Sequence, residues 1–141
     1  MDFVNQENAR MIYPWQPETF EASIGGPTGP SYHIQWTGEL LLYERFGAIV
    51  PFDSQPVPEE RAEVLVSPEA WEEFWAFSKK LRVWKWDEAY DNPEVVCGTR
   101  WSLEIVHGDK QIHSWGSNAY PPRFQSFCKA VSRLVGDQEF S

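Results

Sequence analysis

The last third of the sequence carries the strongest constraint on the fold, because two alternating segments meet there at a short turn. Apolar and polar residues alternate over residues 101–107 and again over residues 110–115, with Gly108-Asp109 between them. Alternation with a period of two is typical of strands that bury one face, and a two-residue turn containing Gly is typical of a β-hairpin. The pattern predicts an antiparallel hairpin. Its core face is expected to carry Trp101, Leu103, Ile105 and Ile112.

The opposite face of the predicted hairpin holds the first candidate site. With a two-residue turn, Glu104 lies directly across from His113, and Trp115 shares their face. A carboxylate beside an imidazole can work as a general acid and base pair. The simpler interpretation is a solvated ion pair on an exposed sheet face, which contributes only a few tenths of a kcal/mol.

Two helices are predicted from apolar residues that recur at spacings of three and four. The first begins with Ser67 as N-cap and Pro68 at the first helical position, and its apolar face includes Trp71 and Phe74. The second extends from about Pro122 to Val135, followed by Gly136 as a C-terminal cap. Its apolar stripe consists of Phe124, Phe127, Cys128, Val131, Leu134 and Val135.

Further strands are expected upstream of these elements. Residues 32–44 predict two strands joined at Thr37-Gly38, a register in which Ile34 opposes Leu41 and Tyr32 opposes Tyr43. Shorter strands are expected around residues 20–24 and 63–66, and residues 83–86 predict an extended run with Trp84 and Trp86 on one side. Residues 45–62 and 87–94 are interpreted as loops.

These elements predict an α+β fold, an antiparallel sheet of about five or six strands with two helices packed on one face. Residues 1–30 contain four prolines and the Gly25-Gly26 pair, so we expect an irregular N-terminal arm there. Residues 31–141 are expected to form a single α+β domain. Both faces of the strands in residues 32–44 carry apolar groups, which suggests that the arm or a partner covers the second face.

Aromatic spacings over residues 32–136 resemble those of a family of small, uncharacterised bacterial proteins. The resemblance implies a compact α+β domain and implies no mechanism, because the family has no assigned activity. Where the family pattern has Asp before a Gly-Thr turn, this chain has Cys97, which departs from it. The residues that carry the resemblance are Trp71, Phe74, Trp75, Leu81, Trp84, Trp86, Tyr90, Gly98, Trp101, Leu103, Ile105, the segment Gly116-Ser117-Asn118-Ala119-Tyr120-Pro121, Phe124 and Phe127.

Charge restricts the partners. Acidic residues number 21 against 12 basic ones, a net charge of -9, which repels nucleic-acid backbones and anionic membranes but attracts a basic protein. The sequence has no leader-like segment and no run of 18 apolar residues, so we expect a cytoplasmic protein. Its two cysteines, Cys97 and Cys128, match neither a metal motif nor a disulfide scaffold.

Motifs for catalysis, cofactors and metals are lacking. The three histidines have no ligand spacing, no glycine-rich phosphate loop occurs, and the serines lack a nucleophile-elbow context. We therefore expect neither a cofactor nor a metal, and the pattern favours a protein without catalysis. Ser117 or Asn118 is expected to satisfy backbone donors at the start of the last helix.

Two functions follow as hypotheses. The first is a non-catalytic, cytoplasmic interaction protein whose acidic surface binds a basic protein, as an immunity protein or an antitoxin does. The second is a small-molecule or carbohydrate site, with hydrolytic chemistry as a further option, on an aromatic sheet face that also carries Glu and His. Its expected residues are Trp84, Trp86, Glu104, His113 and Trp115.

Overall fold

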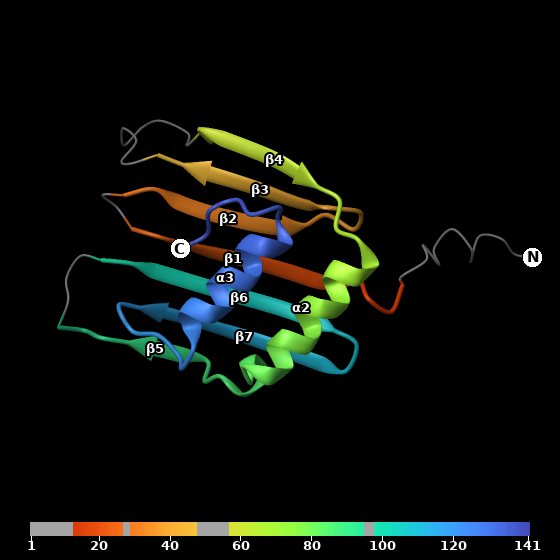
Figure 1. Cartoon of the computed structure of the whole chain (residues 1–141). Coiled ribbons are helices and arrows are strands. Elements are labelled where there is room, and N and C mark those ends of the chain that lie inside the picture. Colours follow the sequence, from red (N-terminus) through yellow and green to blue (C-terminus); the bar gives the residue numbers. More distant parts are fainter. Residues whose placement is uncertain (1–12, 27–28, 48–56, 95–97) are drawn as a thin grey trace, which may run out of the picture.

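A computed structural model describes residues 13–26, 29–47, 57–94 and 98–141. Over these ranges the chain forms one mixed sheet of seven strands in the order β4-β3-β2-β1-β6-β7-β5, with helices α2 and α3 across one face (Figure 1). The α+β fold with two helices on one face is confirmed. The strands are β1 (Thr19–Gly25), β2 (Ser31–Trp36), β3 (Leu41–Phe46), β4 (Glu60–Val64), β5 (Ala89–Asp91), β6 (Arg100–His107) and β7 (Lys110–Ser117).

The short strand expected around residues 20–24 is present as β1, and it lies in the middle of the sheet. It pairs antiparallel with β2 on one side and with β6 on the other. Phe20, Ala22 and Ile24 are buried because they point to the helix side, and the residues between them point the other way. Residues 1–12 of the predicted arm lie outside the described ranges.

The hairpin of β6 and β7 has the predicted register. Ile105 opposes Ile112, Glu104 opposes His113 and His107 opposes Lys110, and Gly108 in the turn has a φ of +63°. That angle lies in the left-handed region that Gly occupies without a steric penalty.

The register predicted for β2 and β3 was wrong by two residues. Ile34 opposes Tyr43 and Trp36 opposes Leu41, because the loop between the strands has four residues. In this loop the Thr37 side-chain oxygen accepts hydrogen bonds from the backbone N–H groups of Glu39 and Leu40, each at 3.3 Å. A shift of two residues keeps every side chain on its face, so the predicted faces hold.

The sheet is mixed because β5 pairs parallel with β7, which corrects the expected all-antiparallel sheet of five or six strands. Sequence analysis interpreted this segment as part of a charged loop. Its three residues are too few to show an alternating pattern. Tyr90 reaches the core side, with its ring centre 6.0 Å from that of Trp101.

Helix α2 spans Pro68–Lys80, and the Ser67 hydroxyl accepts a hydrogen bond from the Ala70 N–H at 3.1 Å, as the N-cap prediction requires. Helix α3 spans Phe124–Leu134 and is followed by Gly136 with a φ of +75°. The N-cap residue of α3 is Arg123, which makes no side-chain cap hydrogen bond. The side-chain oxygen of Asn118 accepts a hydrogen bond from the Thr99 N–H, at 3.0 Å.

The run from residue 83 to 86, expected to be extended, contains the short 3₁₀ helix η1 (Val83–Lys85). It follows Arg82, whose backbone has a φ of +61°. The turn separates the two tryptophans that an extended run would have placed on one side. Trp86 is buried in the core, whereas Trp84 is only partly buried.

Aromatic rings fill the space between the helices and the sheet. Trp71 of α2 is fully buried, stacks on Trp75 at 5.3 Å between ring centres, and meets Trp36 edge-on at 5.6 Å. Phe127 of α3 meets Trp86 edge-on at 5.3 Å. Buried aromatic side chains of this size each contribute several kcal/mol to stability. One face of the sheet is therefore fully used for the core.

Candidate functional site

The other face of the sheet, here called the open face, carries no helix in the described part of the chain (Figure 1). Its side chains alternate with the buried ones along every long strand, and they are partly or fully exposed. The acidic residues whose strand positions or ion-pair contacts place them on this face are Glu21, Glu44, Glu63, Glu88, Asp91 and Glu104. The arginines there are Arg61 and Arg100.

The five residues predicted as a site do not come together. Glu104, His113 and Trp115 lie on the open face, as the hairpin register predicts. Trp84 and Trp86 lie on the helix side, where Trp86 is 8% exposed and Trp84 packs with its ring centre 6.1 Å from that of Trp75. The sheet itself separates the two groups, so no ligand can contact all five side chains.

Glu104 and His113 are direct cross-strand neighbours, yet they form no ion pair within 4.0 Å. The nearer carboxylate to His113 is that of Glu88, with its Oε2 atom 3.8 Å from Nδ1. Both of these side chains are well exposed, at 60% and 75%. Such a contact is a weak, solvated ion pair on an exposed sheet face, which is the simpler of the two interpretations, and it does not have the geometry of an acid and base pair.

Two carboxylates face each other at the centre of the open face. Strand β1 pairs Glu21 directly with Glu104 of β6. Like charges in directly opposite positions of a sheet destabilise it. Glu104 forms no ion pair with any residue that the structure describes. Glu104 thus carries a negative charge without an ion-pair partner on a central strand of the sheet.

A chain of polar contacts extends from this pair toward the β4 edge. The Nε2 atom of His33 lies 2.7 Å from Glu21 Oε2, and its Nδ1 atom lies 3.7 Å from Glu44 Oε1. Arg61 Nε then lies 3.9 Å from Glu44 Oε2. Strands β1 to β4 each contribute one of these four side chains. The imidazole therefore sits between two carboxylates and is held in place by both.

The end of the open face near Gly25 is hollowed. Two adjoining hollows of about 560 and 450 Å³ share Ser23 and Arg100, and we call them together the trough. Arg100 is exposed and forms no ion pair within the described ranges. Trp115 lines the second hollow and is 42% exposed. Other polar or aromatic lining residues are Ser31, Tyr32, His33, Phe46, Asp91, Trp101, Ser102 and Ser117.

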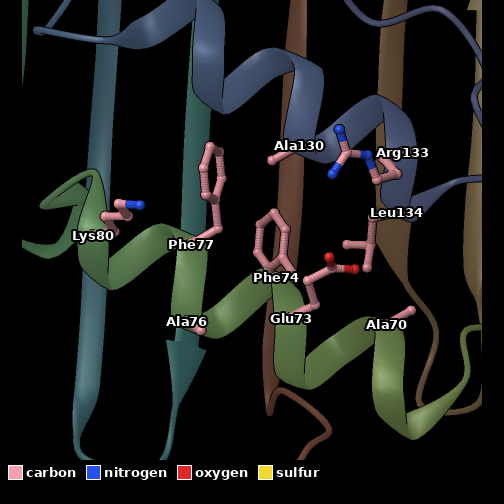
Figure 2. Close-up of a pocket in the computed structure, with 9 residues that line it drawn as sticks. All are labelled: Ala70, Glu73, Phe74, Ala76, Phe77, Lys80, Ala130, Arg133 and Leu134. Atoms are coloured by element: carbon pink, nitrogen blue, oxygen red, sulfur yellow. The ribbon is translucent and has the colours of Figure 1, made fainter.

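A second concavity lies on the helix side, between α2 and α3. Figure 2 shows Phe74 and Phe77 rising from α2 toward Ala130 of α3, with Glu73 and Arg133 at its rim. Its volume is about 240 Å³, below the range of roughly 300 to 1,000 Å³ that is typical of ligand sites. The apolar lining continues the core, so this groove is a weaker candidate than the open face.

The remaining histidine and the described cysteine have structural surroundings. His107 stacks on Trp75 at 4.0 Å between ring centres, and its Nε2 atom lies 2.8 Å from the carbonyl oxygen of Pro14. Burial raises the pKa of the Cys128 thiol to about 12, which leaves it unreactive at neutral pH. Cys97 lies outside the described residues.

Within the described ranges, no group of three or more His, Cys, Asp and Glu side chains is arranged to hold a metal ion. None of the helices there is long and apolar enough to span a bilayer. Neither the protein-family models nor the curated proteins contain a match to this chain. Its function must be inferred from its own geometry.

Sequence reasoning missed the polar chain and the trough because both depend on pairing between distant strands. The alternation of residues 20–24 does place Glu21 and Ser23 on the face opposite Phe20. It cannot show that Glu21 meets Glu104, or that the Ser23 and Ser102 hydroxyls lie 2.7 Å apart. That information is contained only in the register of β1 against β6.

Proposed function

We propose that the protein is a non-catalytic interaction protein whose open face binds a basic surface of another protein. The observation that carries the proposal is the direct opposition of Glu21 and Glu104 on an uncovered sheet face. Two facing carboxylates cost stability in the free chain, and a partner's Lys or Arg placed between them relieves that cost. An immunity protein or an antitoxin acts in this way.

The charge of the whole molecule supports this direction. The chain has a net charge of -9, and the open face contributes more carboxylates than arginines. A surface of one sign steers a partner of the opposite sign and accelerates their encounter. Trp115, 42% exposed at one side of the same face, offers the kind of aromatic anchor that often dominates binding energy.

The test compares capture of cellular proteins by three forms of the purified chain. The open-face variant carries Glu21→Gln and Glu104→Gln, and the control carries Glu69→Gln and Glu72→Gln, which removes the same charge from exposed positions of α2. The expected result is a basic protein that the wild type and the control retain and the open-face variant loses.

Binding of that protein should then be measured by calorimetry with purified components. Affinity is expected to fall as ionic strength rises from about 0.05 to 0.5 M, because screening weakens attraction between exposed charges. Trp115→Ala is expected to weaken binding by at least about tenfold. Equal capture by all three forms would show that the open face is not the binding surface.

A second candidate function rests on the trough. Trp115 supplies an exposed ring. In the same hollow, Arg100 supplies a guanidinium group, Asp91 a carboxylate and Ser102 a hydroxyl. Aromatic rings stack on the apolar face of a sugar, while charged side chains and hydroxyls hydrogen-bond its edge. The geometry therefore also suits a carbohydrate, through residues different from the carboxylate pair.

This second function is tested by titrating neutral monosaccharides and following the indole N–H resonances by NMR. A sugar site predicts that the Trp115 resonance shifts and that Arg100→Gln abolishes the shift. No movement at sugar concentrations up to about 50 mM would reject a site even of millimolar affinity. Trp115 belongs to both candidate functions, but Glu21 and Glu104 do not line the trough, so the carboxylate variants test the first function alone.

A further inference from the structure

Strand β4 forms one edge of the sheet, and it is the longer of the two edge strands. It covers five residues, whereas β5 at the opposite edge covers three. Among the described strands, β4 pairs only with β3, so its outer side has no strand beside it. An unpaired edge strand presents backbone donors and acceptors that a further strand can use.

Of the described residues, the two most exposed large apolar side chains flank this strand. Leu65 is 80% exposed directly after β4, and Val57, 73% exposed, lies three residues before it. Proteins usually protect long edges with charge, and β4 carries Glu60, Arg61 and Glu63. Because these charges have both signs, the edge can accept only a strand whose charges complement them, and the exposed apolar groups beside it add contact area.

The order of charges along β4 determines what can cover it. Arg61 and Glu63 both point to the open face, with Ala62 between them on the other side. If two copies of β4 pair antiparallel about Ala62, the Arg61 of each copy lies directly opposite the Glu63 of the other. The twofold axis therefore generates two cross-strand ion pairs.

Neighbouring registers are unfavourable for the same reason. A shift that centres the pair on Glu63 places two glutamates opposite each other, and a shift that centres it on Arg61 does the same with two arginines. Like charges in directly opposite positions repel. Of the three registers centred on Arg61, Ala62 and Glu63, the one centred on Ala62 places opposite charges across from each other.

We propose that the chain forms a symmetric dimer with a second copy of itself through antiparallel pairing of β4 with β4. The two seven-stranded sheets become continuous, and both open faces lie on the same side of the joined sheet. Arg61, which already lies 3.9 Å from Glu44 within its own chain, then bridges to a carboxylate of the second copy. The proposal is independent of the function assigned to the open face.

The contact is small, so the dimer dissociates on dilution. Sedimentation equilibrium of the full chain, from about 10 µM to 1 mM, is the primary measurement. The expected result is an apparent mass that rises with concentration toward twice the monomer mass of 16.4 kDa. A constant monomer mass over this range would overturn the proposal.

Charge exchange at the edge identifies the surface. Arg61→Glu places glutamates opposite each other and Glu63→Arg places arginines opposite each other, so each variant is expected to remain monomeric. The double variant, with both changes, restores opposite charges and is expected to dimerise again. Both positions are exposed, but Arg61→Glu also places a carboxylate opposite Glu44 of its own chain, so thermal unfolding must show that each variant stays folded at the temperature of the measurement.

Lys80→Glu serves as the control, because it alters net charge as much as Arg61→Glu does but lies on the exposed side of α2. It is expected to leave dimerisation unchanged. A dimer that persists in both single variants would mean that copies associate through another surface, and the proposal would be wrong.

Discussion

Replacing Glu104 by Gln should make the protein more stable, because it removes the repulsion between Glu104 and Glu21 at the centre of the open face. Opposite side chains in an antiparallel pair have Cβ atoms about 5 Å apart, and Glu21 Oε2 is held 2.7 Å from His33 on the other side of β1, so the two carboxylates lie at least roughly 6 Å apart. In water, two unit charges at that distance repel by about 0.7 kcal/mol, which is the upper bound of the effect. Gln keeps the shape and length of the side chain while removing the charge.

Salt separates this effect from other causes. The Debye length is about 8 Å at 0.15 M ionic strength, which reduces the repulsion to about 0.3 kcal/mol, and at 1 M it falls to about 0.1 kcal/mol. The assay is urea unfolding at one fixed pH, at low and high sodium chloride. At low salt the midpoint of Glu104→Gln should rise by about 0.3 M urea.

Asp91→Asn is the matched control for this prediction. Asp91 lies on the same face, but its cross-strand neighbour is Ser117 rather than a carboxylate. The control should show no salt-dependent gain. If Glu104→Gln is no more stable than Asp91→Asn at low salt, or if its gain persists at high salt, the repulsion between the facing carboxylates is not the cause.

Three further predictions concern the core. Gly116→Ala should lower the free energy of unfolding by about 2 to 5 kcal/mol. The added methyl group collides with the Trp101 indole nitrogen and breaks its 2.9 Å hydrogen bond to the Ala119 carbonyl oxygen. A loss below about 1 kcal/mol in urea unfolding would contradict this prediction. Burial raises the pKa of the Cys128 thiol to about 12, so its stabilising contribution is present below the unfolded-state pKa of 9.0 and is lost as pH rises toward 12. The free energy of unfolding of Cys128→Ala should therefore fall less steeply with pH over that window than that of the wild type. An unchanged slope would refute the prediction. Ser78→Ala should raise the thermal unfolding temperature, because the buried Ser78 hydroxyl has no hydrogen-bond partner among the described residues. A lowered unfolding temperature would indicate that the hydroxyl does form a hydrogen bond.

Local patterns were sufficient for the elements whose contacts are close in sequence. The β6–β7 register follows from alternation around a two-residue turn, and the start of α2 follows from the Ser67 cap. The β2–β3 register failed because Thr37 organises a four-residue loop through its side chain, which the Thr-Gly pair alone did not reveal. The correct predictions and the wrong one all depend on how a short polar segment between two elements, or at the start of a helix, satisfies its backbone groups.

Features that depend on distant pairing could not be predicted. The place of β1 between β2 and β6 depends on contacts with distant segments, such as those of Phe20 with Trp71 and Phe74 of α2, and not on a signal in residues 19–25 themselves. The separation of Trp86 from Trp115 by the sheet follows from the 3₁₀ turn at residues 83–85. Glu104, His113 and Trp115 therefore share the open face as predicted, whereas Trp84 and Trp86 lie on the helix side and cannot belong to the same site.

The central position of β1 has a consequence for how the chain folds. Strands β1 to β4 form a continuous meander, but one side of β1 is completed only by β6, whose first residue, Arg100, pairs with Gly25. During synthesis, a chain that ends before Arg100 leaves that side of β1 open, with apolar Phe20, Ala22 and Ile24 lacking half of their surroundings. Pairing over such separations is slow, in the range of milliseconds to seconds for sheets of high contact order. The N-terminal half therefore waits for the C-terminal hairpin, which can form first by itself and then provides the edge on which β1 docks.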